Sequence, residues 1–230
     1  MSAFVGPDGQ PRCRWSGAAP EFLDYHDREW GFPVADDIRL FEKLCLESFQ
    51  SGLSWRSILY KRDGFRAAFD GCDFHKVAQY GADDMARLLQ DDRIVRHRGK
   101  IAAVINNAAR AVEMVEAEGS LAAFFWGVEP DPRTLGRPQS QSTSDSSVAL
   151  ARALKRRGWT FLGPTTVFAF MQAMGLINDH SEDCITRAAV DAARAHFNGP
   201  DALGATGRDA RLVSRRQRAV RAGRRHHAHR

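Results

Sequence analysis

Apolar residues recur three and four positions apart along most of the chain, which is the spacing of helices that bury one face. The clearest examples are Asp37–Gln50 and Arg98–Ala117. Shorter helices are expected at 83–90, within 140–158 and at 165–176. The best strand candidate, WTFLG at 159–163, serves equally well as an extended linker, and no series of alternating strands bounded by turns is visible. The spacing therefore predicts an all-α fold.

The length and composition fit a globular protein. The chain has 230 residues, of which 43% are hydrophobic and 27% charged, so it can bury roughly 70–75% of its unfolded surface without covalent cross-links. One large domain or two small ones would account for this length. No run approaches the ~18 apolar residues of a membrane span. The opening residues lack the basic and apolar parts of a signal peptide, so a cytoplasmic location without membrane attachment is expected.

The positive net charge is concentrated at one end of the chain. Nine arginines and one acidic residue lie at 208–230, which leaves 24 basic and 27 acidic residues over 1–207. The body is therefore mildly acidic, although the whole chain carries +5. A basic tail gives only loose attraction to polyanions, so nucleic-acid binding by the body must depend on a local feature.

Two of the four cysteines each have a histidine nearby. His26 follows Cys13 by thirteen positions, and His180 precedes Cys184 in an H-x-x-x-C pattern. Two thiolates and two imidazoles complete a tetrahedral zinc site of the structural kind, with no position left for water. Such a site would connect the N-terminus to the far end of the fold. The alternative is that the spacing arises by chance, and spacing alone leaves that alternative open.

A short basic turn joins two helical segments within LLQDDRIVRHRGKIAAVI, and it contains Arg96, His97, Arg98, Gly99 and Lys100. A glycine at a helix start lets backbone N–H groups face an anion, and the flanking cations favour phosphate. This pattern is typical of a helix-hairpin-helix phosphate clamp. It is also compatible with an ordinary solvated loop.

One acidic residue follows an apolar helical stripe in a region rich in aromatic residues. Glu47 lies in LESFQSGLSW, and a carboxylate buried there needs a cationic partner or a raised pKa. Aromatic rings beside it would stack on a positively charged aromatic ligand. The simpler explanation from composition is an aromatic core with Glu47 at its margin. The nearby aromatic residues are Trp15, Phe22, Tyr25, Trp30 and Trp55.

Several long motifs, read together, resemble the 3-methyladenine DNA glycosylase I family. They are RCRW, YHDREWGFPV, LFEKLCLESFQSGLSW, IVRHRGKI, LKRRGWTFLGPTTVFAFMQAMGLINDH and the cysteine that follows. The resemblance runs from about Cys13 to Arg187. It implies an all-α fold of the helix-hairpin-helix glycosylase superfamily, with a zinc-bound lobe that joins the N- and C-terminal segments. In this interpretation residues 1–187 form one glycosylase unit, with a helical core at about 36–176 and the lobe at 13–35 plus 177–187, and 188–230 form an Arg/Ala-rich extension.

The resemblance also implies roles for particular residues. Glu47 matches the acid that contacts the alkylated adenine. The implied ligands of one structural Zn²⁺ are Cys13, His26, His180 and Cys184. The implied pocket aromatics are Trp15, Phe22, Tyr25 and Trp55. The implied DNA contacts are Gly52 and Leu53, which enter the gap in the duplex, and the anchoring turn Arg96, His97, Arg98, Gly99 and Lys100.

The implied activity is hydrolysis of the N-glycosidic bond of 3-methyladenine in alkylated double-stranded DNA by a monomeric enzyme. The base rotates out of the stack into the pocket, as in other enzymes that act on bases. No lysine nucleophile is assigned, so strand cleavage is not expected. The alternatives are a non-catalytic, zinc-stabilised DNA-damage-binding module and a helical interaction protein without a nucleic-acid role. Release of the free base separates the enzyme from both.

Overall fold

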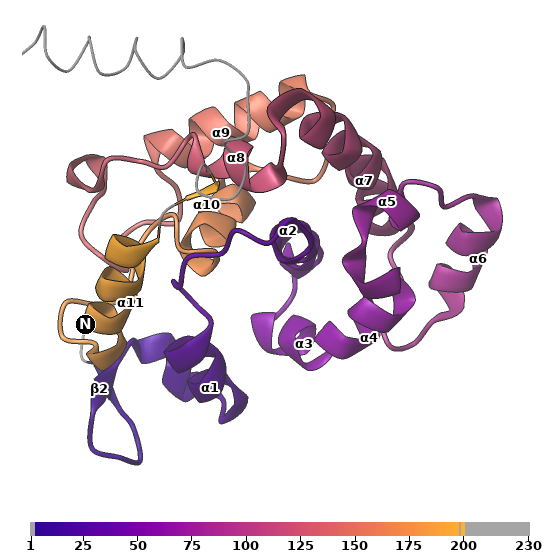
Figure 1. The fold of residues 1–230 in the computed structure, drawn as a ribbon. Coiled ribbons are helices and arrows are strands. Elements are labelled where there is room, and N and C mark those ends of the chain that lie inside the picture. Colours follow the sequence, from indigo (N-terminus) through magenta and orange to yellow (C-terminus); the bar gives the residue numbers. More distant parts are fainter. Residues whose placement is uncertain (1–2, 198, 201–230) are drawn as a thin grey trace, which may run out of the picture. The chain divides into compact units, whose positions relative to one another are not determined.

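The structure is a computed structural model that describes residues 3–197 and 199–200 (Figure 1). The arginine-rich stretch from residue 208 lies outside the described residues, and so does most of the expected extension. The prediction of an all-α fold is confirmed. In chain order the elements are β1 (Phe4–Val5), β2 (Pro11–Arg12), η1 (Arg14–Ala18), α1 (Glu21–Arg28), α2 (Asp37–Gln50), α3 (Trp55–Tyr60), α4 (Arg62–Ala68), η2 (Asp70–Cys72), α5 (Phe74–Val77), α6 (Ala82–Gln90), α7 (Arg98–Glu118), α8 (Leu121–Trp126), η3 (Pro132–Thr134), α9 (Asp145–Arg156), α10 (Pro164–Ala173) and α11 (Ile185–His196).

Helix α2 is the central element of the fold. Figure 1 shows it nearly end-on, and it packs against α10, α7, α8 and α3. All ten residues at 40–49 are buried, so this part of the helix has no solvent face. A helix buried on every side should be apolar throughout. Three of the ten nevertheless have acidic or basic side chains, namely Glu42, Lys43 and Glu47, which makes α2 a candidate for part of a functional site.

The expected helices occur, with small differences at their ends. Helix α2 has the predicted limits, and α7 continues one residue further, to Glu118. The helix expected at 165–176 ends earlier, because Gly175 adopts a positive φ of 81°. A Cβ at Gly175 would lie 2.6 Å from backbone atoms of Phe32 and Pro33, so glycine is required where the N-terminal segment crosses the end of α10.

Residues 159–163 form a linker and not a strand. The side chain of Asn107 on α7 holds this linker, since it accepts a hydrogen bond from the Thr160 N–H at 2.9 Å and donates to the Thr160 carbonyl at 3.0 Å. In the described part of the chain the only sheet is the antiparallel pair β1 and β2. Its strands have two residues each, too few for an alternation to show in the sequence.

The packed part of the chain continues beyond Arg187. Helix α11 runs from Ile185 to His196, across the expected boundary at 187/188, and the side chain of Val190 is fully buried. Asn178 donates to the carbonyl of Arg187 and to the carboxylate of Asp191. The described residues, which end at Pro200, belong to one compact unit. Among its described helices, none combines the length and the apolar character needed to cross a bilayer.

Candidate active site and metal centre

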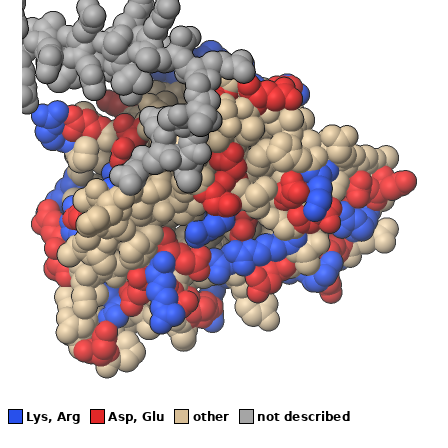
Figure 2. Space-filling model, viewed as in Figure 1, with Lys and Arg blue, Asp and Glu red and all other residues tan. Residues whose placement is uncertain are grey.

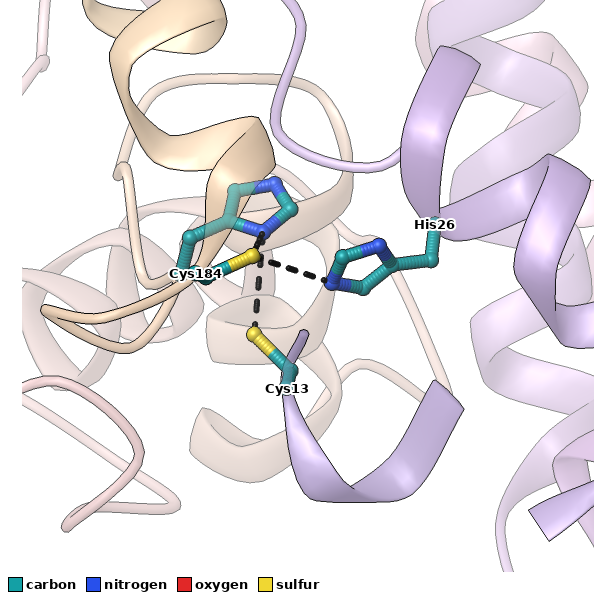
Figure 3. Close-up of side chains that lie close together, drawn as sticks. Cys13, His26 and Cys184 are labelled. Carbon is teal, nitrogen blue, oxygen red and sulfur yellow. Dashed lines mark hydrogen bonds between the residues drawn. The ribbon is translucent and has the colours of Figure 1, made fainter. Parts of the chain in front are cut away.

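The four residues expected to bind zinc lie together in the structure. Cys13 comes just before η1, His26 lies on α1, His180 follows α10, and Cys184 precedes α11. All four are buried, and their donor atoms lie within 4.8 Å of one another. Figure 3 shows the imidazole of His26 facing the two thiols. The fold therefore unites residues from both ends of the packed chain into one cluster that could hold a metal ion.

Hydrogen bonds outside the cluster fix which imidazole nitrogen faces the thiols. His26 donates from Nδ1 to the carboxylate of Asp27 at 2.7 Å, and His180 donates from Nε2 to the carbonyl of Trp30 at 3.0 Å. Both acceptors lack a proton, so the nitrogen left without a proton on each ring points into the cluster. Metal-binding histidines are held in this way by their surroundings.

Asp27 is itself held in place as an anion. Burial opposes its ionisation, but hydrogen bonds from Arg12 and His26 outweigh burial and lower the pKa of Asp27. The guanidinium of Arg12 lies 2.8 Å from the Asp27 carboxylate and 2.7 Å from that of Asp8. This chain of contacts fixes the orientation of His26.

A pocket of about 300 Å³ opens beside α2, and its volume falls at the lower end of small-molecule sites. Aromatic rings from the N-terminal segment and from α3 form much of its wall, and Glu47 is its buried acid. All four predicted pocket aromatics line it. The full lining consists of Trp15, Phe22, Tyr25, Trp30, Glu47, Gln50, Trp55, Gln139, Ala169 and Gln172.

The carboxylate of Glu47 lies in an environment that disfavours its charge. Burial raises the pKa of Glu47, and the ammonium of Lys43 acts in the opposite direction from 3.8 Å away. Burial also lowers the pKa of Lys43 to about 8. Lys43 donates a hydrogen bond to the hydroxyl of Tyr25 at 2.6 Å and lies 4.3 Å from the ring centroid of Trp55.

A larger cavity of about 730 Å³ shares Trp15 and Gln139 with this pocket. The acids that line it, Glu182 and Asp183, are exposed, and its cations are the exposed Arg14 and Arg137. Exposed groups of mixed sign select no particular charge. The smaller pocket, with its buried acid, is therefore the candidate active site.

The predicted contacts to the gap in the duplex lie at the tip of a turn next to the pocket. Gly52 has a positive φ of 78° and Leu53 is 41% exposed. Gln50 lines the pocket and donates to the carbonyl of Leu53 at 3.0 Å. The turn therefore presents an apolar side chain to solvent at the pocket.

The basic turn between α6 and α7 is present, but one of its cations points inward. Arg96, His97 and Arg98 are exposed. Lys100 was expected to contact phosphate, whereas it is buried and its ammonium donates to the carbonyls of Phe49 at 2.8 Å and Ser51 at 2.5 Å. Lys100 thus satisfies carbonyls at the C-terminal end of α2, where a helix favours a cation.

The comparisons with known proteins agree with this geometry. A sequence profile described as methyladenine glycosylase matches residues 15–188. The chain belongs to the 3-methyladenine DNA glycosylase I family. DNA-3-methyladenine glycosylase 1 of Escherichia coli K12 is 45% identical over 180 residues, which cover 75% of this chain and 95% of the relative.

Solved structures of family members show the same fold. A crystal structure of 3-methyladenine DNA glycosylase I has a TM-score of 0.70 and 43% identity, covering 76% of this chain and 98% of that one. The Staphylococcus aureus enzyme, whose structure addresses 3-methyladenine recognition, has a TM-score of 0.69 and 39% identity, covering 74% of this chain and 92% of that one.

Several residues of the site in this family member were not found from the sequence. Gln139 and Gln172 line the pocket and both bond Asp179, whose carboxylate accepts from Gln172 at 2.6 Å and from the Gln139 N–H at 3.1 Å. No spacing signal connects these residues, because they come from a long loop, a helix and the segment before His180. Lys43 could have been noticed as a charge within the apolar stripe of α2.

Proposed function

We propose that this chain removes 3-methyladenine from alkylated duplex DNA by hydrolysing the bond between the base and its deoxyribose. Membership of the family and the names of its relatives support this activity. The observation that carries it is the buried carboxylate of Glu47 in a pocket walled by aromatic rings. An acid in such a place stabilises a cationic aromatic ligand far better than a neutral one.

The chemistry follows from the charge of the damaged base. Methylation at N3 makes adenine cationic within the nucleotide, which weakens its bond to the sugar. After the nucleotide rotates out of the helix, the rings of Trp15 and Tyr25 can stack on the base and Glu47 can pair with its charge. Bond cleavage leaves the base neutral and an oxocarbenium-like sugar that water attacks. The pocket's contribution is selection and positioning of a base that is already a good leaving group.

An excision assay tests this proposal directly. Methylated duplex DNA incubated with the full chain should release free 3-methyladenine, identified by chromatography against the authentic base. Tight binding to the methylated duplex without release would favour the non-catalytic module instead. Affinity for DNA that does not depend on methylation, again without release of the base, would exclude both the glycosylase and the damage-binding module.

We propose that the enzyme is monofunctional and leaves the DNA strand intact. A lyase needs an amine that can attack the sugar. Neither buried lysine lines the pocket, since Lys43 is bonded to Tyr25 and Lys100 to the carbonyls at the end of α2. Borohydride added during turnover should therefore trap no covalent complex, and a trapped complex would contradict this assignment.

We infer that the ion in the cluster is a single structural Zn²⁺. Zinc bonds of about 2.0–2.3 Å in a tetrahedron place neighbouring ligand atoms roughly 3.3–3.8 Å apart. The sulfur of Cys184 lies 3.4 Å from Nδ1 of His180 and 3.6 Å from Nε2 of His26, and the sulfur of Cys13 lies 3.6 Å from Nδ1 of His180. Four protein donors leave no position for water, so the ion would support the fold and take no part in the reaction.

We propose that the α6–turn–α7 unit is a helix-hairpin-helix anchor for the DNA backbone. Arg96 and Arg98 extend into solvent at the N-terminal end of α7, where backbone N–H groups favour an anion. Figure 2 shows acidic and basic side chains intermixed over the face in view, which offers DNA no continuous basic surface there. DNA would therefore be held at this turn and not along an extended basic surface.

Replacing Arg98 with alanine tests the anchor. Binding to any duplex should weaken, and the slope of log affinity against log salt should become shallower by about one, because one phosphate contact is lost. Fluorescence anisotropy between about 50 and 200 mM salt measures both quantities. The matched control is Arg157→Ala, because Arg157 pairs with Glu118 at the opposite end of α7. Equal effects of the two substitutions would contradict the assignment of the turn.

A further inference from the structure

Helix α2 carries a buried ion pair at the pocket, between Lys43 and Glu47, and its lysine has no part in the proposed chemistry. The two residues are one helical turn apart, and their side chains are only 8% and 7% exposed. Fully buried lysine is rare in proteins unless it has a partner. The partners of Lys43 therefore decide what this lysine does.

The surroundings of Lys43 leave Glu47 as its only uncommitted counter-ion among the acids nearest to it. Besides Glu47, the charged groups that act on Lys43 are Glu42 on the same helix, Glu29 after α1, and Arg62 on α4. Glu29 lies 2.7 Å from Arg62, and Glu42 lies 2.9 Å from Arg66. Each of these two carboxylates already has its own arginine.

The geometry of the pair leaves Glu47 able to bind something else. The short hydrogen bond of Lys43 goes to the hydroxyl of Tyr25 at 2.6 Å, whereas its distance to the Glu47 carboxylate is 3.8 Å. Lys43 does not line the pocket, but Glu47 does. Tyr25 thus holds an ammonium that is not part of the pocket lining, and the carboxylate of Glu47, which does line the pocket, is available to a ligand.

We propose that Lys43 is the resident counter-ion of Glu47 and a specificity-determining positioning residue, which keeps the carboxylate charged for a cationic purine. The inference rests on the proposed function, because it gives Glu47 the role of recognising that purine. Burial alone would protonate Glu47 and make the pocket indifferent to ligand charge. The ammonium prevents this without contacting the ligand.

The proposal predicts a particular effect of pH. An opposite charge at such a distance lowers the pKa of an acid, so removal of the ammonium should raise the pKa of Glu47. In Lys43→Met, binding of a cation should begin to fall at a higher pH than in the wild type. Well above that pH, Glu47 is ionised in both proteins and the repulsion from Lys43 is gone, so Lys43→Met should bind the cation at least as tightly.

The test is a binding titration of the full chain between pH 6 and 8.5 with two probes. One is 3,9-dimethyladeninium, whose charge is fixed by methylation at both nitrogens, and the other is neutral 9-methyladenine. At pH 6 we expect Lys43→Met to bind the cation about tenfold more weakly than the wild type, and at pH 8.5 no more weakly. For the neutral probe, the ratio of affinities between Lys43→Met and the wild type should be the same at pH 6 and at pH 8.5. Lys43→Arg, which restores the charge, should return the wild-type affinity for the cation at pH 6.

Control variants separate this role from packing. Lys100→Met removes another buried ammonium, one that bonds backbone carbonyls at the end of α2, and it should lower stability without moving the pH profile. Lys43→Gln replaces Lys43→Met if the latter does not fold. An unchanged profile in the Lys43 variants, or equal losses of both probes at every pH, would overturn the proposal. A wild type that does not prefer the cation would instead refute the recognition role of Glu47 in the proposed function.

Discussion

Glu47→Gln is expected to lower the rate of 3-methyladenine excision about 10–100-fold. The substitution keeps the shape of the side chain but replaces a charge-assisted contact to the cationic base, worth about 1.5–3 kcal/mol, by a neutral one. Folding should change little. Lys43, whose pKa burial already lowers to about 8, can release its proton once the carboxylate is gone. Single-turnover excision and thermal unfolding of the same preparation measure the two effects.

Glu42→Gln is the matched control for this substitution. Glu42 is also a buried glutamate on α2, but it pairs with Arg66 and does not line the pocket. We expect Glu42→Gln to alter stability and to leave the ratio of excision between methylated and unmodified adenine unchanged. If the two variants lose activity in parallel with their stability, Glu47 is a structural residue.

Cys184→Ser is expected to produce the largest loss of stability, about 3 kcal/mol or more. The cluster of two cysteines and two histidines joins segments that are almost the whole packed chain apart, and removal of such long-range cross-links typically costs about 2–5 kcal/mol. For a chain of this size the loss corresponds to a fall in Tm of about 6–12 °C. Differential scanning calorimetry, combined with elemental analysis of bound metal, measures both consequences. A strong chelator should lower the Tm of the wild type and have no further effect on the variant.

Cys72→Ser supplies the comparison for Cys184→Ser. Cys72 is buried and free, and it lies outside the cluster. A hydroxyl in its place costs some stability but should leave the zinc content at one per chain and the response to chelator intact. Fully active, stable protein that contains no zinc would show that the four donors serve another purpose.

Most of the fold could be predicted because its helices have strong apolar periodicity. The limits of α2 were predicted correctly, since the stripe ends where Ser51 and Gly52 follow. The hairpin of β1 and β2 could not be predicted, because two-residue strands carry no alternation. The early end of α10 depends on Gly175, whose positive φ makes room for residues of a distant segment. Such a requirement is set by tertiary packing and not by the local sequence.

The residues that gather in the site could be predicted, but the directions of their side chains were harder to predict. A resemblance between sequences indicates which residue types gather, and the four donors of the cluster and the pocket aromatics do lie together. Lys100 shows what that information lacks. In the sequence it is one cation among several in a turn, yet helical geometry at the start of α7 directs its ammonium to the carbonyls of α2. Lys43 was overlooked because a lysine inside an apolar stripe is most simply assigned to the edge of a helix face.

The location of the cysteines and histidines has a consequence for biosynthesis. Tyr25 is bonded to Lys43, but the cluster that holds the segment carrying Trp15 and Tyr25 is complete only when His180 and Cys184 have also left the ribosome. A nascent chain therefore possesses the rings without the support that arranges them around a purine. We therefore expect a fragment that stops before Cys184 to lack a fully arranged pocket and to release no 3-methyladenine.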